Sequence, residues 1–291
     1  MSWADRRGRL RQLGKISELI LDKGISPYPE LIELAAVAAL IDKELDSEPL
    51  IGRSTRVVKL LHNLHDITIE RGPAFDFLAC KRGCSLCCDL YVSASPPDIF
   101  AIADSIRART SKSRLAQTID QIESANSPAQ GLSAAERADT RIMCAFLKDN
   151  LCTIYQVRPV ACRSWCSTSL STCEAGARGE SVDIPQPEYV PLTRFGYDHA
   201  HWLVLKHRGL DATSYELVHA VLVALKNPDL EISWLDGERV FAGVAEDHSE
   251  DPTFAEGARI DELWSETIWD VAHGDPPPDS VFSQKLPKWC L

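Results

Sequence analysis

The feature that most constrains this chain of 291 residues is the placement of its cysteines, because nine of the ten fall within one stretch. They open with the pattern Cys-x3-Cys-x2-Cys-Cys and continue at irregular spacing: Cys80, Cys84, Cys87, Cys88, Cys144, Cys152, Cys162, Cys166 and Cys173. Thiolates are soft donors that suit zinc, copper(I) or an iron–sulfur cluster far better than magnesium or calcium. The sequence therefore predicts a thiolate metal centre.

Structural disulfides are the alternative explanation of so many cysteines. The start of the chain lacks the apolar region of a signal peptide, and no run reaches 18 apolar residues. We therefore expect a cytoplasmic protein, and disulfides are rare in that reducing compartment. Adjacent Cys87 and Cys88 could pair with each other only by straining the peptide between them. Metal binding is the better reading.

Composition limits the classes of partner. Hydrophobic residues make up 45% and charged residues 25% of the chain, as in ordinary globular proteins. The formal net charge of −11 would repel a phosphate backbone, and no local basic patch offsets it. We expect no nucleic-acid partner and no membrane association, whereas an unknown protein partner or substrate stays open.

The chain divides into four expected regions. They are an N-terminal helical region over 1–72, a cysteine-cluster domain over 73–180, a C-terminal helical region over 181–275 that packs on it, and a tail over 276–291. Apolar residues recur at helical spacing over Leu10–Ile20, Pro29–Leu40, Thr55–Ile69, Pro96–Ile106, Ser113–Ser124, Tyr189–Lys206, Leu217–Leu225 and Ile260–Val271. The expected fold is mainly α, a bundle-like helical domain with a loop-rich cysteine centre.

Local signals place several helix starts. Ser95 is expected to cap a helix that has Pro96 in its first turn. Ser133-x-x-Glu136 and Thr213-x-x-Glu216 both read as capping boxes, in which a hydroxyl and a carboxylate bond reciprocally to backbone N–H groups. These signals support the helical assignment.

Only one hairpin is expected, over Glu231–Phe241, where Asp236-Gly237 lies between apolar pairs. The spacing Cys80-x3-Cys84-x2-Cys87 also matches the signature of radical S-adenosylmethionine enzymes. That chemistry normally sits on a β/α barrel, and the alternating strands of a barrel are missing. We expect no reductive cleavage of S-adenosylmethionine.

The first cysteine group admits two local geometries. Offsets of four, seven and eight residues would put its four sulfurs on one helix face, whereas Gly83 makes a tight loop equally plausible. Four thiolates around Zn²⁺ or a 4Fe-4S cluster leave a net charge of about −2, which needs nearby cations. Arg158 and Arg163 are the favoured cations, while Lys81 and Arg82 are at least as well explained as solvated loop charges.

Two histidine pairs are the other candidates for ligands: His62-x2-His65 and His199-x-His201. Isolated helical histidine pairs are more often surface or capping features than ligands. The surface or capping role is therefore the favoured expectation, and a metal role for the two pairs stays open.

Several motifs carry a family resemblance: the Cys80–Cys88 group, Cys144-Ala-Phe-Leu, Cys152-Thr-Ile-Tyr, Arg158-Pro159 and Cys162-Arg163. Over about residues 75–175 the chain resembles the YkgJ-type cysteine-cluster family, a zinc- or iron-chelating domain. Asp98 stands where members of that family often carry aspartate. One branch contains flagellin lysine N-methylases, which are associated with an iron–sulfur cluster and S-adenosylmethionine, so the resemblance also offers an enzymatic alternative.

The resemblance implies a set of eight ligands: Cys80, Cys84, Cys87, Cys88, Cys144, Cys152, Cys162 and Cys166. Cys173 is less secure, and Cys290, beyond a Pro-rich segment, is expected to be dispensable. Eight sulfurs exceed the four of one tetrahedral ion. Two metals, a thiolate-bridged site or some free cysteines all remain open.

Overall fold

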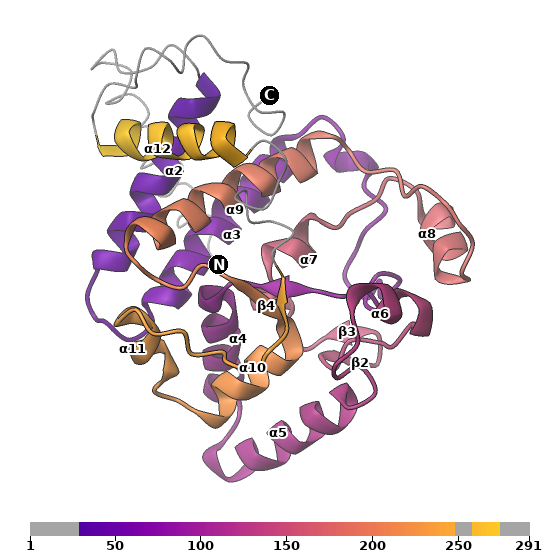
Figure 1. Ribbon diagram of the computed structural model, residues 1–291. Helices are drawn as coiled ribbons and strands as arrows, with labels where there is room; N and C mark the ends of the chain where they lie inside the picture. The colour runs from indigo at the N-terminus through magenta and orange to yellow at the C-terminus, as the bar shows by residue number, and fades with distance from the viewer. Residues whose placement is uncertain (1–28, 248–257, 274–291) are drawn as a thin grey trace.

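The computed structural model describes residues 29–247 and 258–273, and helices dominate them (Figure 1). The longer helices are α2 (Pro29–Asp46), α3 (Arg53–Arg71), α4 (Pro96–Arg109), α5 (Lys112–Asn126), α9 (Tyr189–His207), α10 (Leu217–Lys226) and α12 (Ala258–His273). The shorter ones are α6 (Ala134–Thr140), α7 (Val160–Ser164), α8 (Leu170–Ala177), α11 (Leu230–Leu235) and the 3-10 turns η1 (Phe75–Phe77) and η2 (Tyr155–Val157). The expected mainly α fold is confirmed, while the helix expected over Leu10–Ile20 lies outside the described residues.

Two groups of helices make up the body. In the first, α2 packs against α3, α9 and α12, and in the second, α4 lies between α3 and α10, which in turn contacts α5. Apolar side chains of both groups form one buried cluster. Phe146 and Ile154 from the cysteine region belong to the same cluster, so this region is held to the helices by ordinary hydrophobic burial.

The described residues contain two small antiparallel sheets, of which the first joins distant segments. In the first, β4 (Ser214–Glu216) lies between β1 (Ser93–Ala94) and β5 (Glu246–Asp247). The second is a hairpin of β2 (Leu147–Lys148) and β3 (Leu151–Cys152), whose two turn residues, Asp149 and Asn150, have φ of 51° and 58°. Positive φ at both central positions matches the right-handed twist of the paired strands. The described strands form no barrel.

Two of the three expected helix starts are confirmed. The Ser95 hydroxyl accepts the Asp98 N–H at the start of α4, and Ser133 with Glu136 forms a full capping box on α6. The box expected at Thr213 is wrong. Residues 214–216 are drawn into β4, and the Glu216 carboxylate caps α10 instead, accepting the Val218 and His219 N–H groups at 3.2 and 2.7 Å.

The hairpin expected over Glu231–Phe241 is also wrong, because residues 230–235 form α11. Two long-range contacts favour this helix. The buried Glu231 carboxylate accepts the Gly52 and Ser54 N–H groups at 3.0 Å each, which caps α3, and the buried Trp234 indole donates to the Asp211 carbonyl. Gly237, with φ of 90°, follows the helix rather than closing a hairpin.

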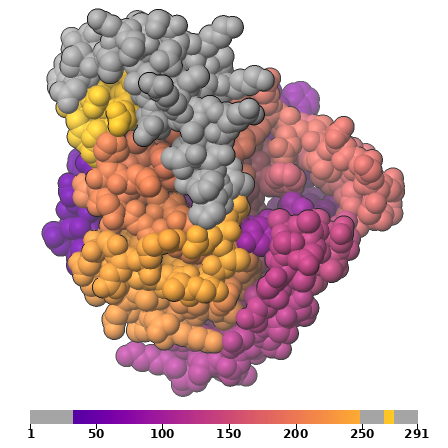
Figure 2. All heavy atoms as spheres, viewed as in Figure 1, coloured from indigo at the N-terminus to yellow at the C-terminus, as the bar shows by residue number. Residues whose placement is uncertain are grey.

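No helix in the described ranges is both long and apolar enough to cross a membrane. Figure 2 shows that the segment around α8 projects from the body, and that the surface is hollowed between it and the segment around α6. Both segments belong to the cysteine region.

Candidate metal centre

The first cysteine group lies on turns rather than on a helix. Cys84 N–H donates to the Lys81 carbonyl and Cys88 N–H donates to the Ser85 carbonyl, both at 3.0 Å. Gly83 has φ of 92°, a left-handed conformation that a residue with a Cβ rarely adopts. Of the two geometries that the sequence allowed, the structure has the loop.

Backbone hydrogen bonds bring the second half of the cysteine region to the first. Cys144 N–H donates to the Cys88 carbonyl at 2.7 Å, and Ala79 N–H donates to the Ser167 carbonyl at 2.8 Å. These bonds hold Ala79 and Cys88 against residues more than fifty positions later in the chain. Cys152 lies on β3 and Cys162 on α7, two short elements that the sequence left as turns and loop.

The sulfurs interact electrostatically in two groups that share Cys87. The first group surrounds Cys80 and contains Cys84, Cys87, Cys166 and Cys173. The second surrounds Cys162 and contains Cys87, Cys144 and Cys152. Cys88 joins both through a hydrogen bond with Cys87. The eight predicted cysteines and Cys173 thus belong to one connected set of pairwise interactions.

Closeness of the sulfurs does not by itself identify the ligands of a metal ion. Within the described ranges, no three Cys, His, Asp or Glu side chains surround one point as the ligands of a single ion. The assignment of the eight cysteines as ligands therefore stays a prediction.

Burial keeps several of these thiols protonated. It raises the pKa of Cys162 to about 12 and the pKa of Cys144 and Cys166 to about 11. A hydrogen bond with Cys88, followed by burial, raises the pKa of Cys87. A metal ion would have to displace these protons, because the thiolate is the ligand.

Arg158 lies among the sulfurs. Its positive charge opposes the rise in pKa at four of the thiols: Cys87, Cys152, Cys162 and Cys166. Its guanidinium covers the Tyr155 ring, 4.3 Å from the ring centroid, and its buried Nε has no hydrogen-bond partner. A buried donor that nothing accepts is uncommon, and a thiolate sulfur is the kind of acceptor that this position would take.

Arg163 turns to a different neighbour. Its Nη1 donates to both carboxylate oxygens of Asp66 on α3, at 3.1 and 2.9 Å, and Nη2 donates to the Gln156 carbonyl at 2.7 Å. The residue thereby ties α7 to α3. A role of Arg163 in cofactor binding stays a prediction, whereas its bonds to Asp66 give it a structural role.

Three further polar groups near the cysteines have different surroundings. Lys81 and Arg82 are exposed, as expected of solvated loop charges. The Ser167 N–H donates to the Cys80 Sγ at 3.3 Å, a backbone contact that fixes the direction of a sulfur and leaves no trace in the sequence.

The histidine pairs are buried, so the expectation of surface or capping residues is wrong. His62 and His65 on α3, and His199 and His201 on α9, are all less than 9% exposed. His62 Nε2 lies 3.9 Å from Asp98 Oδ1 and, like His201 Nε2, has no hydrogen-bond partner. Polar residues in a helical pattern give no sequence signal of burial when the partner helix is distant in sequence.

Comparison with known protein families supports metal binding in general. Residues 79–179 match the CxxCxxCC family model, whose description reads "Putative zinc- or iron-chelating domain". No curated protein and no solved structure matched the chain. The match covers roughly a third of the sequence and all nine clustered cysteines. Over residues 79–179, therefore, the chain matches a cysteine-rich domain family described as zinc- or iron-chelating.

Proposed function

We propose that this protein holds zinc or an iron–sulfur cluster through the thiolates of its cysteine-cluster domain, with iron–sulfur favoured on the resemblance alone. The eight cysteines of the predicted set would supply the ligands. The match of residues 79–179 to a zinc- or iron-chelating family is the observation that carries the proposal.

The local structure suits such a group. Soft sulfur donors gather around Arg158, whose unused Nε can donate to a thiolate and whose charge offsets part of the negative charge of a thiolate-bound metal. The first four cysteines lie on turns, which adjust more readily than helices or paired strands. Closing the sulfurs on a metal therefore needs changes in turns rather than in the helical body.

The two overlapping sulfur groups leave the number of metals open. Cys87 belongs to both groups, so either two separate sites or one polynuclear site fits. Zinc would supply structural cross-linking without redox chemistry, and an iron–sulfur cluster would add one-electron transfer.

The first role that we propose for the metal is to stabilise the fold. A closed set of thiolates generally serves stability, because the free energy of metal binding becomes free energy of folding. We also propose a cytoplasmic location, because thiols stay reduced there and remain available to bind metal.

Anaerobic purification followed by metal analysis, sulfide analysis and an absorption spectrum tests the proposal. We expect iron with a matching amount of inorganic sulfide and a brown colour. A colourless protein with stoichiometric zinc would reverse the preference between the two metals. A protein without either metal, whose melting temperature does not change on reconstitution, would contradict metal binding itself.

A further inference from the structure

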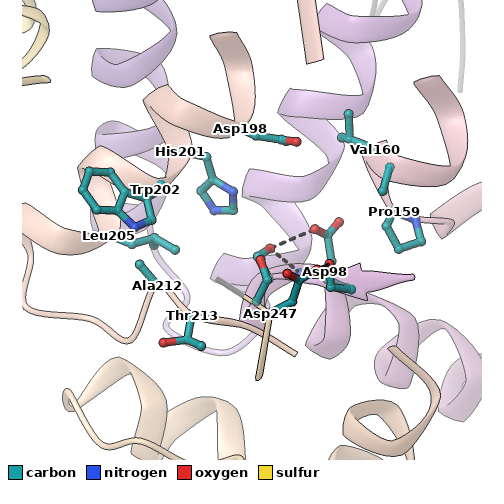
Figure 3. Close-up of a pocket in the computed structure, with 15 residues that line it drawn as sticks. Asp98, Pro159, Val160, Asp198, His201, Trp202, Leu205, Ala212, Thr213 and Asp247 are labelled. Carbon is teal, nitrogen blue, oxygen red and sulfur yellow. Dashed lines mark hydrogen bonds between the residues drawn. The ribbon is translucent and has the colours of Figure 1, made fainter. Parts of the chain in front are cut away.

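A small pocket lies where the first sheet meets α4, α7 and α9 (Figure 3). Its volume of about 60 Å³ corresponds to roughly four water-sized spheres. Its apolar lining includes Val160, Trp202 and Leu205. The polar lining includes Asp98, His201 and two further carboxyl groups, Asp198 and Asp247, so the pocket is acidic.

The Asp98 carboxyl group comes from the first turn of α4. One oxygen accepts the Ser95 hydroxyl at 2.8 Å, and the other lies 3.9 Å from His62 Nε2. Burial, with a contribution from the Asp198 carboxylate, raises the pKa of Asp98 to about 6. The group is therefore still ionised at neutral pH, in a buried position where an anion is costly unless a cation offsets it.

His201 supplies an independent observation. Its side chain is 4% exposed, and Nε2 has no hydrogen-bond partner among the described residues. Figure 3 shows the ring pointing from α9 toward the side of the pocket where Asp98 and Asp247 lie. Burial lowers the pKa of His201 to about 4, so the imidazole is neutral. A buried neutral imidazole nitrogen without a partner, facing carboxyl groups, is suited to a cation or to water bound to one.

The other two carboxyl groups are oriented by hydrogen bonds. Asp247 accepts the Ser93 hydroxyl at 2.7 Å, and Asp198 accepts the Arg194 Nε at 3.2 Å. Carboxylates that ligate metals are generally held in this way by hydrogen-bond donors behind them. Carboxylate oxygens suit magnesium or manganese, whereas an imidazole suits transition metals, so the mixed donor set favours manganese over magnesium.

We propose that this pocket binds a divalent cation of the manganese type through Asp98 and His201, with Asp247 reaching the ion through bound water, at a site separate from the cysteine centre. No three such side chains in the described ranges surround one point, so water must fill the remaining coordination positions of the ion. The pocket has room for an ion and a few waters.

Titration of the purified full-length protein with Mn²⁺, followed by electron paramagnetic resonance of the free ion, tests the proposal. We expect one Mn²⁺ per chain, because thiolates compete poorly for this hard ion. Asp98→Asn and His201→Gln should each weaken binding at least about tenfold. Asp104→Asn is the matched control on α4, since Asp104 bonds to Thr55 and Arg107 outside the pocket, and it should bind Mn²⁺ like the wild type.

Three results would overturn the proposal: no Mn²⁺ binding by the wild type, equal binding by Asp98→Asn and Asp104→Asn, or a rise in melting temperature with propylammonium but not with Mn²⁺. The last would identify a pocket for an organic cation. Circular dichroism checks that each variant is folded, and the wild-type titration decides the matter if one is not. Zinc or iron content should be the same in Asp98→Asn and the wild type, so this test is independent of the cysteine centre.

Discussion

Arg158 and Arg163 are five residues apart, yet their side chains serve different parts of the molecule. Arg158 lies among the thiols, and Arg163 bonds to Asp66 on α3. The sequence shows two arginines beside Cys162 and so predicts cations near sulfur. It cannot show which of them reaches the sulfurs, because that depends on the path of α7 and on a carboxylate 97 residues earlier.

Replacing Arg158 tests its part in holding metal. In Arg158→Met the charge beside four thiols and a possible donor to thiolate sulfur are lost, so metal should leave at least about tenfold faster. The measurement is the rate of metal transfer to a chelator. Arg82→Met is the control, since Arg82 is exposed, and its rate should equal that of the wild type. Equal rates in both variants would show that Arg158 has no part in holding metal.

Among the elements, α11 best shows where sequence reasoning stops. Asp236-Gly237 between apolar pairs is a sound hairpin signal, but the residues before it are needed elsewhere. Glu231 caps α3, which has no side-chain cap of its own, and Trp234 is buried in the core. By contrast, the starts of α4 and α6 depend on residues within four positions of each other. They were predicted for that reason.

Glu231→Gln tests the link between α11 and α3. The amide has one acceptor oxygen in place of two, so one buried N–H of Gly52 or Ser54 loses its partner, at a cost of about 1–3 kcal/mol in the free energy of unfolding. Urea unfolding measures the change. Glu238→Gln, at an exposed position of the following turn, should leave the midpoint unchanged. A Glu231→Gln midpoint as high as that of the control would mean that this cap contributes nothing.

The junction of α3 with α9 depends on Gly72. A Cβ at this position would overlap the Tyr189 ring, so Gly72→Ala should lower the free energy of unfolding by about 1–3 kcal/mol. Adding Tyr189→Leu removes the overlapping ring. The double variant should therefore lose less free energy of unfolding than the two single variants lose in sum. Strict additivity in denaturant unfolding would contradict this packing argument.

At the scale of the whole molecule, the mainly α fold could be predicted because seven of the long helices show clear apolar periodicity. The approach of cysteines from positions 80 to 166 could not, since it depends on backbone bonds such as Cys144 to Cys88. The division into regions 1–72, 73–180 and 181–275 stays a prediction. One buried cluster nevertheless runs from Leu34 to Val271 and includes Phe146.

This shared core determines what metal removal should do. The buried cluster consists mainly of helix side chains, while the first cysteines lie on turns. Chelation should therefore lower the melting temperature and leave most of the helical circular dichroism signal, with each kcal/mol lost lowering the melting temperature by about 2–4 °C. Loss of the whole helical signal on chelation would contradict this view, because the helical body would then depend on metal.

The most direct test of the central claim is the zinc or iron content per chain of single cysteine-to-serine variants, measured after anaerobic purification. Cys162 is the best position to change, because its sulfur interacts with three other predicted ligands. We expect Cys162→Ser to lose most of its metal, and Cys290→Ser, outside the matched domain, to keep the wild-type amount. Equal metal content in the wild type and both variants would mean that these cysteines do not form the metal centre.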